Sequence, residues 1–113
     1  MSSISTREAS SIQEHRIAKK LDGNVISNSG AGLFKKGDVV LDDNFLVECK
    51  TCMKPKDSFS IKKEWIEKNK KELLQNRLQY HCIAFNFDYN DPKDYYVIDD
   101  LLMNILLEKL REG

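Results

Sequence analysis

GDVVLDDNFLVECK, residues 37–50, is the stretch that decides the fold. Two apolar runs, 37–41 and 45–50, flank the turn-forming residues Asp-Asp-Asn at 42–44. A short polar turn between two runs of strand-forming residues is the pattern of a β-hairpin. The sequence therefore predicts two antiparallel strands here, and the rest of the chain is interpreted around them.

The register of this hairpin brings two acids together. If Leu41 faces Phe45 across the turn, Asp38 lies directly opposite Glu48. Directly opposed side chains have Cβ atoms about 5 Å apart, and like charges there are destabilising unless a positive charge lies between them. A divalent cation is the obvious candidate, because it takes hard carboxylate oxygens as ligands.

The two faces of the second strand differ in chemistry. Side chains alternate along a strand, so Lys50 projects from the same side as Glu48. Phe45, Val47 and Cys49 project from the other side and suit a packed interior. The hairpin therefore separates a charged face from a core face.

A third acid comes from a helix expected over residues 7–21, which starts with a capping box, S-x-x-E, and stops at Gly23. Glu14 falls on the stripe expected to turn inward, together with Ile17, Ala18 and Leu21. Buried carboxylates are usually paired or bind metals. The alternative is that Glu14 lies at the edge of the stripe and reaches water or a basic side chain.

Composition indicates one soluble domain over residues 1–113, with 41% hydrophobic and 32% charged residues. No apolar run at the N-terminus resembles a signal peptide, and none approaches the ~20 residues of a membrane span. Three cysteines, an odd number, fit reduced thiols. We therefore expect a cytoplasmic protein without a membrane partner.

The net charge is zero, but the charges are unevenly placed. Residues 50–71 carry eight lysines against three acids, whereas residues 88–113 carry seven acids against three basic residues. Lysines beside an acidic metal site suit an enzyme that acts on a polyanionic backbone. The alternative is a solvated lysine-rich face without a ligand.

The remaining elements follow from periodicity and turn residues. We expect a short strand at 25–27, a helix over 61–79, strands at 80–87 and 95–98, and a last helix capped by Asp99 or Asp100. On the helix over 61–79, the apolar stripe expected to face inward is Ile66, Leu73, Leu74 and Leu78.

The last helix is apolar over well over half of its circumference, which exceeds what one face against a sheet uses. A second copy of the chain is a plausible cover, because two-fold dimers are the commonest oligomers. The alternative is a helix wedged between two elements of the same chain.

Taken together, Glu14 on a first helix, Gly37-Asp38, Glu48-x-Lys50 and a lysine-bearing helix resemble the PD-(D/E)XK nuclease superfamily. The segments SNSGAGLFKKGDV, FLVECKT and SFSIKKEW resemble phage-encoded and archaeal-type Holliday junction resolvases, and the resemblance covers roughly residues 8–87. Gly37 stands where proline is the motif residue. The resemblance implies an α/β fold with a restriction-endonuclease-like αβββαβ core, a mixed central sheet flanked by helices, and a C-terminal helix.

The resemblance also implies magnesium-dependent hydrolysis of phosphodiester bonds, with manganese as a substitute, by a homodimer that cuts four-way DNA junctions symmetrically. Asp38 and Glu48 would ligate the metal with the backbone carbonyl of Cys49, and Glu14 would hold a second ion or a coordinated water. Lys50 would orient the attacking water or stabilise the transition state. The expected DNA contacts are Ser29, Gly30, Lys35, Lys36, Ser60, Lys62 and Lys63.

Other interpretations have weaker support in the sequence. Cys49-x-x-Cys52 lacks a second pair with zinc spacing other than His81-Cys82, and it does not lie at a helix start as a thioredoxin-like motif would. Two functional alternatives stay open: a restriction-like or repair nuclease acting on duplex, flap or mismatched DNA, and a non-catalytic DNA-binding dimer.

Overall fold

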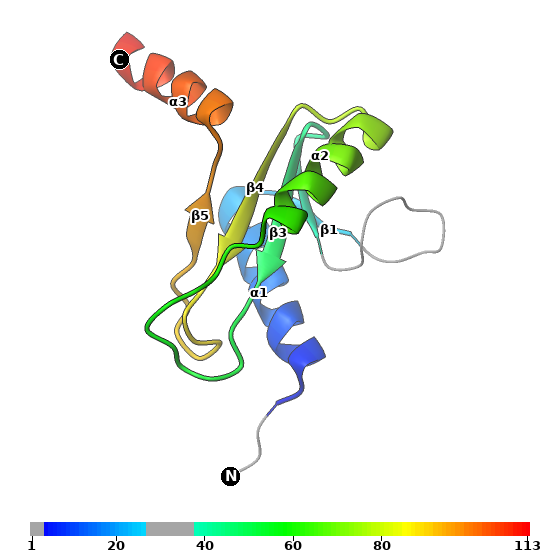
Figure 1. The fold of residues 1–113 in the computed structure, drawn as a ribbon, viewed down its shortest axis with the longest axis vertical. Helices are drawn as coiled ribbons and strands as arrows, with labels where there is room; N and C mark the ends of the chain where they lie inside the picture. Colours follow the sequence, from blue (N-terminus) through cyan, green and yellow to red (C-terminus); the bar gives the residue numbers. More distant parts are fainter. Residues whose placement is uncertain (1–3, 27–37) are drawn as a thin grey trace.

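The structure, a computed structural model, describes residues 4–26 and 38–113 (Figure 1). The α/β class, the mixed sheet and the C-terminal helix expected from the sequence are confirmed. Among the described residues, no helix has the length and apolar character needed to cross a membrane. The elements, in chain order, are α1 (Thr6–Leu21), β1 (Asn24–Val25), β2 (Val39–Leu41), β3 (Phe45–Lys50), α2 (Lys63–Asn76), β4 (Tyr80–Phe85), β5 (Tyr95–Val97) and α3 (Asp100–Glu112).

The five described strands form one sheet in the order β1-β2-β3-β4-β5. Neighbouring strands are antiparallel except β3 and β4, which are parallel. Parallel neighbours need a crossover connection, and α2 supplies it. The crossover places α2 next to the strand that carries Glu48 and Lys50.

The hairpin between β2 and β3 has the predicted register, with Leu41 opposite Phe45 and Val39 opposite Val47. Its turn is closed by a hydrogen bond from the Asn44 amide to the Leu41 carbonyl oxygen, at 3.0 Å. The two aspartates at 42 and 43 have φ of 51° and 57°. Aspartate tolerates this left-handed conformation better than most side chains, which explains the turn sequence.

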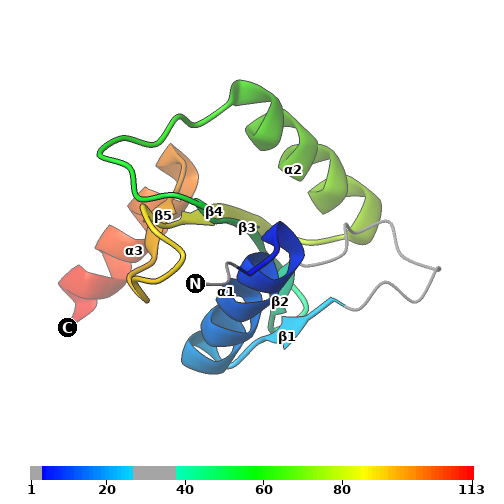
Figure 2. The same cartoon turned by 90° about the horizontal axis from the view of Figure 1, so that it is seen from below.

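The two faces of the sheet are covered by different helices, as Figure 2 shows with α1 on one side and α2 on the other. The face under α1 holds the apolar core cluster, which consists of Ile17, Ala18, Val39, Val47, Cys82 and Ala84. The face under α2 carries polar groups of β3 and β4, including Glu48 and His81, both buried. The hairpin therefore has a core face under α1 and a charged face under α2, as predicted from the sequence.

The inward stripe expected on this helix is wrong in part, because Ile66, Leu73 and Leu78 are half-buried but Leu74 is not. Leu74 is 84% exposed, whereas the buried residues of this helix are Asn69 and Glu72. The reason lies in the sheet beneath, because polar side chains on β3 and β4 need polar partners when they are buried. Asn69 Nδ2 lies 3.3 Å from His81 Nδ1 in this interface.

The start and end of α1 follow the predicted signals. Ser5 and Glu8 form the capping box, and the helix ends at Leu21 with Asp22 in the left-handed conformation. Gly23 then passes close to β2, where a Cβ atom would overlap Leu41 Cδ2 and come within 3.0 Å of the Val40 carbonyl oxygen. This close approach explains the glycine.

Polar contacts fix α1 against the far end of β3. The buried Gln13 donates from Nε2 to the Lys50 carbonyl oxygen at 2.8 Å. Arg16 donates to both carboxylate oxygens of Asp94, at 2.8 and 2.7 Å, and this pairing raises the pKa of Arg16. The Gln13 bond thus ties α1 to the backbone of Lys50, and the bidentate Arg16 pair, of a strong and directional kind, ties α1 to the residue before β5.

His81 is buried between β4, α2 and the start of α3. Burial is the largest effect on its pKa and lowers it from the ordinary value of 6.5, with the charge of Lys70 acting in the same direction. The Asp99 carboxylate, 3.9 Å from His81 Nε2, opposes this shift without reversing it. The folded protein therefore holds neutral histidine at pH values where the unfolded chain is protonated.

We expect the free energy of unfolding to fall as the pH drops through about 6.5 toward the lower folded-state pKa, because the unfolded chain then binds more protons. Urea denaturation at about pH 7.5 and about pH 5.5 measures this change. The His81→Gln variant should lose this part of the pH dependence, whereas His15→Gln, at an exposed position, should retain it. An unchanged pH dependence in His81→Gln would contradict the assignment.

Candidate functional site

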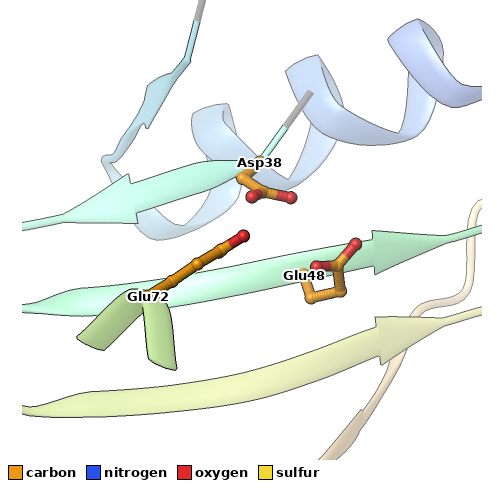
Figure 3. A group of neighbouring side chains, drawn as sticks. All are labelled: Asp38, Glu48 and Glu72. Carbon is orange, nitrogen blue, oxygen red and sulfur yellow. The ribbon is translucent and has the colours of Figure 1, made fainter. Parts of the chain in front are cut away.

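Three buried carboxylates meet between the sheet and α2. One oxygen each of Asp38, Glu48 and Glu72 lies within 4.8 Å of the others (Figure 3). The three residues are 2%, 5% and 3% exposed, respectively. In Figure 3 the side chain of Glu72 reaches from α2 toward the space between the other two.

The hairpin and the crossover helix position these acids. Asp38 precedes β2 by one residue, so continuing the ladder beyond the pair Val39 and Val47 places it opposite Glu48. Its carbonyl oxygen accepts a 2.8 Å hydrogen bond from the Ile26 amide, which fixes the backbone at this point. The structure thus brings Asp38 and Glu48 together, as the register requires.

Lys50 lies on the same face, with Nζ 3.6 Å from Glu48 Oε2. Its ammonium is also 4.4 Å from the centroid of the Trp65 ring, a cation–π distance. The side chain is 24% exposed, so the ammonium sits at the border between the buried acids and solvent. Lys50 is therefore held from two sides, by an acid of β3 and by an aromatic ring of α2.

Three ionised carboxylates this close together would repel one another. At an effective dielectric constant of about 20, two unit charges about 4.8 Å apart repel by roughly 3 kcal/mol, and the group contains three such pairs. A positive ion among the three carboxylates would reverse the sign of this energy. Such an ion would add to the positive charge of the Lys50 ammonium, which lies 3.6 Å from Glu48 Oε2.

The oxygen atoms also have suitable spacing for a small divalent ion. Magnesium binds oxygen ligands at about 2.0–2.1 Å, so two ligands on opposite sides of it are about 4 Å apart. The 4.8 Å limit of this group exceeds that span by less than about 1 Å, which small side-chain rotations can close. Asp38, Glu48 and Glu72 are therefore the residues that can hold such an ion.

Glu14 is half-buried on α1 and does not belong to the group of three acids. Its helix covers the opposite face of the sheet. Its charge still acts near the site, because Glu14, Asp38 and Glu48 all raise the pKa of the Cys49 thiol, for which burial is the largest cause. Within the carboxylate group, Glu72 occupies the place for which the sequence suggested Glu14.

The cysteines give the zinc interpretation no support. Cys49, Cys52 and Cys82 are free thiols, and none of them joins the described metal-capable group. Burial raises the pKa of Cys82 to about 12, which disfavours the thiolate that zinc requires. The side chain of Cys49 packs against the apolar core cluster, so the backbone carbonyl is the ligand that this residue can offer.

The predicted DNA contacts fall into two sets. Ser60, Lys62 and Lys63 are exposed at the start of α2, and Lys62 Nζ lies 5.8 Å from the centroid of the Trp65 ring. Lys62 is therefore close to the ring that contacts Lys50. Ser29, Gly30, Lys35 and Lys36 lie outside the described residues.

Sequence reasoning missed Glu72. The available signal was the spacing of Asn69 and Glu72, which are i and i+3 and so share one face of this helix. That face packs on the polar side of the sheet.

No protein-family model matches the chain, and no curated protein and no solved structure shows significant similarity to it. The resemblance to nucleases thus stays a prediction, and the functional argument rests on the geometry of the site.

Proposed function

We propose that this protein is a metal-dependent endodeoxyribonuclease of the PD-(D/E)XK type, with a restriction-endonuclease-like fold, and that it resolves Holliday junctions. One observation carries the proposal: three buried carboxylates lie within 4.8 Å of one another, and a lysine ammonium lies 3.6 Å from one of them. Acids that can hold a metal beside a positively charged donor are what phosphodiester hydrolysis requires.

In this proposal magnesium, or manganese as a substitute, is held by Asp38, Glu48 and Glu72, with the Cys49 carbonyl as a further oxygen ligand. When bound, the metal polarises a phosphoryl oxygen and lowers the pKa of a coordinated water. Glu14 contributes negative charge near the site or holds a coordinated water. Burial of the acids keeps bulk water away and strengthens these electrostatic effects.

Lys50 acts on the charge that develops during cleavage. Its ammonium can donate hydrogen bonds to a phosphate oxygen of the scissile group or orient the attacking water. The contacts with Glu48 and the Trp65 ring restrict its position, and the Gln13 hydrogen bond to its carbonyl oxygen fixes its backbone. Such preorganisation reduces the rearrangement needed in the transition state.

The lysine-rich segment supports a nucleic-acid substrate. Eight lysines against three acids in residues 50–71 give a local positive excess on the segment that ends β3 and enters α2. Positive charge next to an acidic centre can hold phosphates while one of them reacts. A four-way junction is the proposed substrate, and a cytoplasmic location, in the host cell if a phage encodes the protein, belongs to the same proposal.

The exposed apolar residues of α3 support the proposed homodimer. Figure 1 shows α3 extending from the end of β5 with most of its length away from the sheet. Four of its apolar residues are 45–76% exposed: Leu101, Met103, Leu106 and Leu110. A second copy can cover this surface, and a two-fold dimer would present two sites to a symmetric junction.

Replacing any of the three acids by its amide should reduce cleavage of a labelled four-way junction by at least about 100-fold while junction affinity stays largely intact, because the lysines carry the binding. The variants are Asp38→Asn, Glu48→Gln and Glu72→Gln. Glu67→Gln is the matched control, since Glu67 is an exposed acid of the same helix. Gel assays with magnesium or with chelator measure cleavage, and binding is measured separately.

The substrate arm of this experiment compares the junction with a linear duplex of the same sequence. Paired nicks on the junction alone support resolution. Equal cutting of both favours a restriction-like or repair nuclease, and binding without cutting favours a non-catalytic dimer. Full activity of Glu72→Gln would remove Glu72 from the site.

For the dimer, wild-type protein should sediment at twice the mass of one chain, and Leu106→Asp should shift it to the monomer because a charge would be buried in the interface. Ile12→Asp is the control, as Ile12 is a 51% exposed apolar residue of α1. Analytical ultracentrifugation measures the mass. A monomeric wild type, or an intact dimer in Leu106→Asp, would contradict this arrangement.

A further inference from the structure

Lys50, which contacts Glu48 of the acid group, also lines a pocket. Its volume is about 440 Å³, in the range of pockets that hold small organic groups. Two aromatic rings and three lysines line it: Phe59, Trp65, Lys50, Lys54 and Lys56. None of the roles proposed above for the acid group uses Phe59, Lys54 or Lys56.

The walls of the pocket are held by buried polar contacts. Asn86, which is 0% exposed, accepts hydrogen bonds at Oδ1 from the Thr51 hydroxyl and the Cys52 amide, each at 3.0 Å. The Lys56 amide donates to the Phe87 carbonyl oxygen at 2.9 Å. The segment that carries Lys54 and Lys56 is therefore tied to the residues that follow β4.

The aromatic wall is fixed as well. Phe59 stacks on Phe85 of β4, with ring centroids 4.7 Å apart and planes 21° apart. Its ring is 6.1 Å from that of Trp65, and both residues are only partly buried. The rings of Phe59 and Trp65 are therefore held in place and remain partly exposed. They offer a rigid apolar surface to a ligand.

Lys50 connects this pocket to the acids. Its Nζ is 3.6 Å from Glu48 Oε2 and 4.4 Å from the Trp65 centroid, and the residue also lines the pocket. A phosphate that reacts at the acid group therefore has its neighbouring nucleotide within reach of the aromatic wall. Lys54 and Lys56, both exposed, are placed to contact flanking phosphates.

We propose that this pocket receives an unpaired nucleotide adjacent to the scissile phosphate. Aromatic rings combined with lysines are the chemistry by which proteins bind single strands, since the bases stack on the rings and the lysines follow the backbone. In a regular duplex both faces of each base are stacked on neighbours, so the rings have access only where a base is unstacked. The inference rests on the proposed nuclease function and specifies its substrate class: DNA with an unstacked nucleotide at the cleavage point.

Trp65 is the one tryptophan of the chain, so its fluorescence reports directly on the pocket. The full-length protein is titrated in chelator, where no cleavage occurs, with a single-stranded oligothymidylate and with a blunt duplex of equal length. The single strand should quench the fluorescence and bind about tenfold more tightly than the duplex, since base stacking on aromatic residues contributes on this order.

Two variants separate the contributions of charge and ring. Lys54→Gln/Lys56→Gln should weaken single-strand binding and reduce the slope of log K against log salt by about 1.4, or about 0.7 for each phosphate that a lysine no longer neutralises. Phe59→Leu keeps an apolar side chain against Phe85 and should lower affinity about fivefold with the salt slope unchanged. Lys19→Gln/Lys109→Gln is the charge-matched control on α1 and α3, and it should retain the wild-type slope.

Equal affinity for the duplex and the single strand, or a salt slope in Lys54→Gln/Lys56→Gln that equals the control's, would overturn the proposal. Circular dichroism confirms that each variant is folded. This binding experiment is independent of catalysis. If single strands quench the Trp65 fluorescence but the protein cuts no DNA, the proposed nuclease activity is refuted and the proposed nucleotide pocket is retained. If the protein cuts junctions but shows none of these binding effects, the nuclease activity is retained and the nucleotide pocket is refuted.

Discussion

The burial of Asp38, Glu48 and Glu72 within 4.8 Å of one another is the constraint on which the rest of the site depends. Three carboxylates buried within 4.8 Å of one another cost several kcal/mol unless positive charge compensates them. Hydrophobic residues in these positions would stabilise the fold more simply. The group is the feature that the proposed metal site needs, because a divalent cation among the three acids would offset their charge and would fit the spacing of their oxygens.

The scaffold around the acids explains how they are held so close. The antiparallel hairpin places Asp38 opposite Glu48, and the parallel crossover brings α2 over the same face with Glu72. On the other side of the sheet, the apolar core cluster and the hydrogen bond from Gln13 to Lys50 keep β3 fixed. The strand beneath the acids is therefore fixed from the opposite face of the sheet.

Much of this arrangement was predictable from local patterns. The hairpin register, the capping box of α1 and the side on which Lys50 projects depend on neighbouring residues and strict periodicities, and all three are confirmed. The inward face of α2 was not predictable in this way, because Asn69 and Glu72 are buried only in response to polar groups on β3 and β4. That burial depends on contacts between α2 and strands that are distant from it in the sequence, and local patterns do not encode these contacts. For the same reason, sequence alone suggested Glu14 for the place that Glu72 holds.

The most direct test of this account is a crystal of the protein soaked in manganese, with anomalous diffraction locating the ion. The account predicts a peak about 2 Å from carboxylate oxygens of Asp38, Glu48 and Glu72. An ion elsewhere, or no bound ion at millimolar manganese with the three acids still clustered, would contradict the claim that these carboxylates form a metal site.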